Sequence, residues 1–103
     1  VAAAMMLARG AEAIAHGAVK LDNYTFDKVI GFLGYRTLVK FDQTYAYGEK
    51  EDEFKELCSA AYSVPRFVIG EVAVGEFEEL ENEDLSDRFG LRRSDFPAYF
   101  LFD

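Results

Sequence analysis

Short apolar runs alternate with amphipathic stretches along most of the chain. Four runs rich in Val, Leu, Ile or Phe predict strands, at about residues 19–22, 36–42, 67–74 and 98–102. The stretches between them space apolar residues three or four positions apart, as the buried face of a helix requires. The pattern therefore predicts one α/β domain with the order β-α-β-α-β-α-β.

Three segments predict the helices of this order. One spans about residues 48–62 and begins with acidic residues, which favour the positive end of the helix dipole. Another spans about residues 82–89 and stops at Gly90. The first helix is short, and its apolar face consists of Phe26, Val29 and Ile30. Strands that alternate with helices indicate a largely parallel sheet covered on both faces.

The composition supports one packed domain at residues 18–103. Half of the 103 residues are hydrophobic, including 10 Phe and 6 Tyr, so a core is well supplied and disorder is disfavoured. Residues 1–17 are expected to form a flexible segment, and Ala-Ile-Ala at 13–15 resembles a signal-peptidase site after an apolar stretch. The apolar run at 98–102 predicts that a further strand and a covering helix follow in the complete protein.

Charge and residue content argue against several classes of function. A net charge of −8 argues against nucleic acid and against anionic membranes. No run of 18 apolar residues is present, so membrane insertion is not expected. The acidic run at 76–87 lacks the ligand alternation and central Gly of an EF-hand loop. Neither a metal site nor a cofactor is therefore predicted.

The segment at residues 38–50 carries the most specific pattern. A strand of buried type runs into a short loop, and the loop opens the acidic helix. This order resembles the place where thioredoxin-like domains carry two redox cysteines. The corresponding positions are Ala46 and Glu49, with Tyr47 and Gly48 between them, so no thiol is present there. The scaffold of an oxidoreductase without its sulfur chemistry favours binding over catalysis.

The resemblance extends over residues 19–103, and one family matches these residues more closely than thioredoxin does. The chain resembles the N-terminal thioredoxin-like domain of the family of endoplasmic reticulum resident protein 29 and Windbeutel. The run Tyr-x-Tyr-Gly-Glu-Lys at 45–50 is the specific part of the match. The other matching segments are 21–22, 25–30, 38–42, 51–55, 79–82, 85–89 and 96–102.

This resemblance implies a redox-inactive relative of protein disulfide isomerase. Such proteins act in the endoplasmic reticulum lumen as chaperone or escort factors for secretory polypeptide, and they form homodimers. In the thioredoxin fold the proline that matches Pro97 is cis and lies beside the redox loop. Ala46 departs from the family, which usually carries Pro at that position, so a less rigid loop is expected. The resemblance implies neither an enzyme activity nor a cofactor.

Tyr45 and Tyr47 are the main candidates for peptide binding. Each tyrosine offers a broad apolar ring and a hydroxyl that needs a partner, and two of them on one loop can hold an extended peptide. The alternative is that one ring packs in the core and the other is incidental surface. The resemblance implies that Pro97 and the loop with Phe77 and Glu79 border the same surface, and the alternative for that loop is a solvated acidic turn. Asp42 ends the strand under the tyrosine loop, where it can contact the peptide at the rim, cap the following helix, or be a solvated strand end.

Val19, Leu21 and Asp22 match the segment that serves dimerisation in this family. An edge strand with exposed backbone groups is suited to self-pairing, although an ordinary edge strand of a monomer has the same pattern. Two other functions stay open. One is a thiol- or glutathione-dependent oxidoreductase that uses Cys58 or the tyrosines, and the other is a purely structural dimerisation module. Cys58, the single cysteine, falls on the apolar face of its helix, which favours a buried structural thiol.

Overall fold

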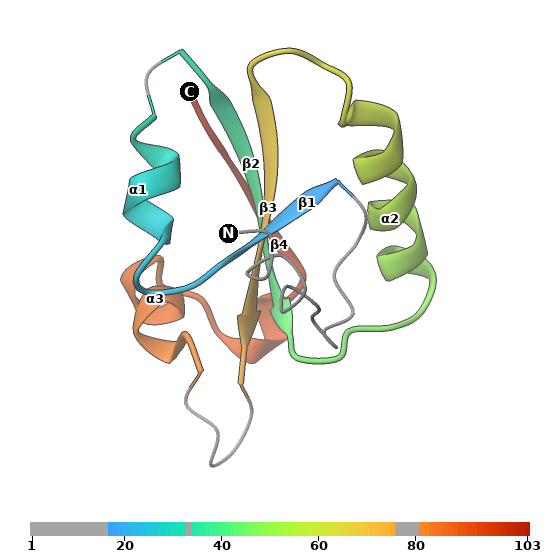
Figure 1. Ribbon diagram of the computed structural model, residues 1–103. Coiled ribbons are helices and arrows are strands. Elements are labelled where there is room, and N and C mark those ends of the chain that lie inside the picture. Colours follow the sequence, from blue (N-terminus) through green and yellow to red (C-terminus); the bar gives the residue numbers. More distant parts are fainter. Residues whose placement is uncertain (1–16, 33, 76–80) are drawn as a thin grey trace, which may run out of the picture.

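A four-stranded sheet forms the centre of the molecule (Figure 1). The computed structural model describes residues 17–32, 34–75 and 81–103. The strand order is β1-β3-β2-β4; β1 and β2 both pair parallel with β3, and β4 pairs antiparallel with β2. The strands are β1 (Ala18–Leu21), β2 (Arg36–Gln43), β3 (Phe67–Val74) and β4 (Ala98–Phe102). The largely parallel sheet expected from the sequence is confirmed.

Helices cover both faces of this sheet. Helices α1 (Phe26–Ile30) and α3 (Glu83–Arg88) lie on one face, and α2 (Glu49–Ala61) lies on the other (Figure 1). A short 3-10 helix, η2 (Arg93–Asp95), precedes β4. The predicted α/β class and element order are confirmed. Gly48 and Tyr62, which the apolar spacing assigned to the second helix, flank α2 as its caps.

The larger core lies between the sheet and helices α1 and α3. Side chains alternate along a strand, so Val39 and Phe41 of β2 face this core and are fully buried. Aromatic rings from α1, β2, β4 and the C-cap of α3 meet there at centroid distances of 5.1 to 6.3 Å. The rings are those of Phe26, Phe41, Phe89, Phe100 and Phe102. Burying a Phe ring stabilises the fold by about 2–3 kcal/mol, so this cluster is the main anchor of the sheet.

The face under α2 is split into an apolar row and a polar row. The smaller core there consists of Phe54, Cys58 and Ile69, with Leu38 packed against it. The next residue of β2 on the same face after Leu38 is Lys40. The strand pairing aligns Lys40 with Glu71 of β3 and with Tyr99 of β4. The polar row therefore lies next to the loop that leaves β2.

Candidate functional site

The loop between β2 and α2 is fixed at both of its ends. The Thr44 hydroxyl donates a hydrogen bond to the carbonyl of Val74 at 3.3 Å, and the Gly48 carbonyl accepts the N–H of Asp52 at 3.0 Å. Gly48 has φ +102° and ψ −170°, a backbone conformation that is essentially restricted to glycine. Tyr45 has φ +60°, in the left-handed region that costs a bulky residue about 1 kcal/mol or more.

Both loop tyrosines project into solvent. Tyr45 is 84% exposed and Tyr47 is 85% exposed. The alternative in which one of the two rings packs in the core is therefore wrong. Two large apolar rings on one short loop add little to the packing of this chain, so both are available to a partner.

A groove lies beside this loop, and we call it the loop groove. It has a volume of about 480 Å³. Its walls come from the end of β2, the loop, the first turn of α2, η2 and the Phe96–Pro97 peptide, which is cis as the resemblance implied. The lining residues are Asp42, Gln43, Ala46, Tyr47, Glu49, Lys50, Glu51, Glu53, Arg93, Phe96 and Pro97.

A second hollow continues the loop groove along α2 toward β4. It has a volume of about 350 Å³ and shares Lys50, Glu53 and Pro97 with the loop groove. Its other lining residues are Phe54, Leu57 and Tyr99. Together the two hollows form a continuous surface on which an extended chain can lie.

The structure brings three of the predicted peptide-binding residues together in the loop groove. Asp42, Tyr47 and Pro97 line it. Tyr45 is exposed on the same loop but is not among the lining residues. Phe77 and Glu79 lie outside the described residues.

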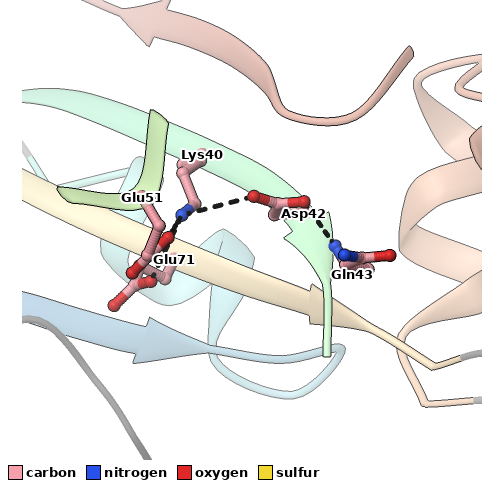
Figure 2. Close-up of polar contacts among 5 residues, drawn as sticks. All are labelled: Lys40, Asp42, Gln43, Glu51 and Glu71. Carbon is pink, nitrogen blue, oxygen red and sulfur yellow. Dashed lines mark hydrogen bonds and ion pairs between the residues drawn. The ribbon is translucent and has the colours of Figure 1, made fainter. Parts of the chain in front are cut away.

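A buried lysine contacts two of the carboxylates that line the loop groove, those of Asp42 and Glu51 (Figure 2). Lys40 donates a hydrogen bond to Glu51, and its ammonium lies 3.4 Å from the Asp42 carboxylate and 3.9 Å from that of Glu71. The same ammonium lies 4.2 Å from the ring centroid of Phe54, within cation–π range. Lys40 thus connects β2, β3 and α2 through one charge.

The charge on Lys40 is maintained by its neighbours. Burial alone would lower the pKa of Lys40, but the hydrogen bond to Glu51 and the charges of Glu51, Asp42 and Glu71 outweigh burial. The pKa of Lys40 therefore lies above its ordinary value of 10.5, and the side chain is protonated at neutral pH. Asp42 also accepts the backbone N–H of Gln43 at 2.7 Å. The N-cap of α2 is Gly48, without a side-chain cap, so Asp42 does not cap this helix; its carboxylate lies near Lys40 and lines the loop groove.

Lys40 was not among the predicted site residues, although the sequence carries a signal for it. Lys40 interrupts the apolar run Leu38-Val39-Lys40-Phe41, and a central strand rarely buries an ammonium without a carboxylate partner. That pattern indicates a buried ion pair. The identity of the partners depends on strand register and on the placement of α2, which the run alone does not give.

Cys58 is a buried thiol on the inner face of α2. It is fully buried, and burial together with the nearby charge of Glu71 raises the pKa of this thiol to about 11. A thiol in this environment is a poor nucleophile at neutral pH, because the reactive form is the thiolate. The positions that match the redox cysteines of thioredoxin-like domains, Ala46 and Glu49, both line the loop groove.

Only one of the three residues in the predicted dimer segment offers its side chain to a partner on the β1 edge. Val19 is 45% exposed on β1, which lies at one edge of the sheet. Leu21 is fully buried in the chain's own core. Asp22 accepts hydrogen bonds from the backbone N–H groups of Tyr24 and Thr25 at 2.9 and 3.0 Å. The bond from Tyr24 holds the pKa of Asp22 below its ordinary value, so this carboxylate stabilises the turn before α1.

Neither a metal-ligand cluster nor a membrane-spanning helix is found in the part of the chain that the structure describes. No group of three or more His, Cys, Asp or Glu side chains there is placed to hold a metal ion. Among the same residues, no helix has the length and apolar character that crossing a membrane requires.

Three comparisons place the chain among known proteins. The family model described as "ERp29, N-terminal domain" matches residues 13–103. Protein windbeutel of Drosophila melanogaster is 38% identical over 87 residues, which cover 84% of this chain and 34% of that protein. The chain thus spans about a third of the length of this relative.

The third comparison concerns the fold. Thioredoxin f2 of Chlamydomonas reinhardtii matches with a TM-score of 0.63 and 17% identity, covering 84% of this chain and 75% of that one. A likeness at this level of identity shows the thioredoxin-like fold, and the fold alone.

Proposed function

The chain belongs to the family of the ERp29 N-terminal domain, and from this premise we propose that it binds extended secretory polypeptide without catalysing a reaction. The observation that carries this proposal is the loop groove with Tyr47 on its wall and Pro97 at its other side. A groove with an exposed aromatic ring and no thiol is suited to hold a chain rather than to exchange its disulfides.

The proposed binding is weak and tolerant of sequence. The loop groove and the hollow beside Tyr99 are open, so a peptide would gain from ring contacts and would leave much of its backbone in solvent. Tyr47 would contact the peptide inside the groove, and Tyr45 would contact a flanking residue. A chaperone or escort factor in the endoplasmic reticulum lumen needs such a site, because it must release many different clients.

The rival proposal of a thiol-dependent oxidoreductase has less support. Its single thiol, Cys58, is fully buried and does not line either hollow. Tyr45 and Tyr47 project into solvent, whereas the Cys58 thiol is enclosed on the inner face of α2. A disulfide-reductase assay on the folded protein is expected to give no turnover.

A peptide titration tests the proposed site. Short extended peptides with paired aromatic residues are titrated against the wild type and against the Tyr45→Ala/Tyr47→Ala variant by fluorescence anisotropy. Removing two ring contacts is expected to weaken binding at least tenfold, since aromatic anchors dominate such interfaces. The control is Tyr24→Ala/Tyr62→Ala, because these rings are 84% and 74% exposed but line neither hollow. Equal affinities for all three proteins would reject the site.

A further inference from the structure

The lining of the loop groove is unevenly charged. Its four carboxylates outnumber its two cationic side chains, Lys50 and Arg93. The carboxylates belong to Asp42, Glu49, Glu51 and Glu53. In a concave surface, like charges reinforce one another, so this groove attracts positive charge more strongly than a flat surface with the same residues.

Lys50 lies on the groove lining with Glu49 and Glu53, and the other two cations near the groove already have partners. Lys40 is shared by Glu51, Asp42 and Glu71. Arg93 donates a hydrogen bond to the carbonyl of Gly75, outside the carboxylate set. Glu49 and Glu53, in contrast, are exposed on the first turns of α2 and lie on the groove wall. An incoming cation would therefore meet carboxylates at the wall that Lys40 does not neutralise.

Aromatic and apolar groups stand next to these carboxylates. Tyr47, Phe96 and Pro97 line the same groove. A guanidinium or ammonium group can pair with a carboxylate and lie over a tyrosine ring at the same time, which makes the combination selective. The groove is thus complementary in charge and in polarity to one kind of peptide segment.

We propose that the loop groove selects polypeptide segments in which Arg or Lys adjoins an aromatic residue. This proposal rests on the proposed function, since it names the client segments that the peptide-binding surface prefers. The aromatic residue contacts Tyr47 and the Phe96–Pro97 wall, and the basic residue pairs with the carboxylates of Glu49 and Glu53. Segments with Asp or Glu at the same place are repelled.

Three labelled peptides that differ at one position test this selectivity. Each carries the same aromatic pair, followed by Arg, by Ala or by Glu. We expect the Arg peptide to bind about threefold to fivefold more tightly than the Ala peptide, which is the scale of one exposed ion pair, and the Glu peptide to bind more weakly. The difference should shrink between about 0.05 M and about 0.5 M NaCl, because salt screens exposed charges.

Matched variants locate the effect in the groove. Glu49→Gln/Glu53→Gln should bring the ratio of the affinities for the Arg and Ala peptides to about one, because the carboxylates that pair with Arg are gone. The control Asp52→Asn/Glu56→Gln removes the same charge from the exposed surface of α2 outside the groove, and it should retain the preference.

The outcomes separate this inference from the proposed function. If all three peptides bind equally, the charge selectivity is overturned while the aromatic site stands. If the preference is lost equally in both pairs of variants, it reflects the overall charge of the chain, and the groove assignment fails. If no peptide binds even at low salt, the proposed function itself fails.

Discussion

Tyr45 is the residue whose conformation the fold explains least. Its φ of +60° is unfavourable for a bulky side chain, and its ring is 84% exposed. The chain thus holds an apolar ring in solvent at a cost to stability and gains no internal packing from it. Such a residue is expected where a partner uses the ring, which agrees with the proposed site.

A second single residue, Cys58, gives a prediction about how stability depends on pH. Burial raises the pKa of this thiol from its ordinary 9.0 to about 11. Between these values the unfolded chain loses the thiol proton while the folded chain keeps it, so the free energy of unfolding falls as pH rises through this window. Chemical denaturation of wild type and Cys58→Ala at about pH 8 and about pH 10.5 checks this. The wild type should lose more stability than the variant between the two values.

The same measurements have a clear contrary result. Equal losses of stability for wild type and Cys58→Ala would mean that the thiol titrates normally in the folded chain. Alkylation by iodoacetamide offers an independent check, since a protonated buried thiol reacts slowly until the chain unfolds. Rapid labelling of the native protein at neutral pH would revive the thiol-enzyme alternative.

At the scale of elements, Gly48 determines how α2 leaves the loop. An added Cβ at this position would meet no atom within 4 Å, so the backbone conformation alone requires glycine. Gly48→Ala should therefore lower the free energy of unfolding by about 1–3 kcal/mol through strain.

Gly90→Ala is the matched control for this prediction, because Gly90 also has open space but a φ of +68°, which alanine adopts at a lower cost. Denaturant titration of both variants gives the comparison. A loss in Gly48→Ala no greater than that in Gly90→Ala would contradict the assignment of strain to the start of α2.

The ion pairs of Lys40 give a second prediction, which concerns the connection between β2, β3 and α2. Lys40→Met leaves the Glu51 carboxylate buried without its cation, and such a loss typically costs about 3–5 kcal/mol. When Glu51→Gln is added to Lys40→Met, the unpaired carboxylate of Glu51 is removed, and part of the lost stability should return. Denaturant unfolding of the two single variants and the double variant measures this coupling. Strictly additive losses would show that the two side chains do not stabilise each other.

The elements themselves were predictable, whereas the groove was predictable only in part, through Asp42, Tyr47 and Pro97. The apolar runs determine which segments are strands, and every predicted strand and helix is present within about a residue or two of its expected ends. The loop groove instead combines side chains from β2, α2 and η2, which are far apart in the sequence and meet only through the sheet order. Glu51 and Arg93 are groove residues for this reason, and no local pattern marks them.

At the scale of the whole molecule, self-association through β1 remains a proposal. Val19 is the best probe of it, since Leu21 is buried in the chain's own core and Asp22 stabilises a turn. If the β1 edge pairs with a second copy, Val19→Lys should shift sedimentation toward the monomer, because a lysine on an edge strand opposes pairing.

The matched control is Val64→Lys, which introduces the same charge at a valine that is 48% exposed but lies outside β1. Analytical ultracentrifugation of wild type and both variants over a range of concentrations gives the result. If the wild type stays monomeric at every concentration, the proposed dimer is rejected.

We propose that the surface around the loop groove holds polypeptide without sulfur chemistry. Chemical-shift mapping by heteronuclear NMR during a titration with an aromatic peptide tests it most directly. If the groove holds the peptide, the backbone signals of Tyr47, Lys50 and Glu53 should move together and saturate. Shifts confined to β1 or to the surroundings of Tyr24 and Tyr62, with the loop and the start of α2 unmoved, would contradict it.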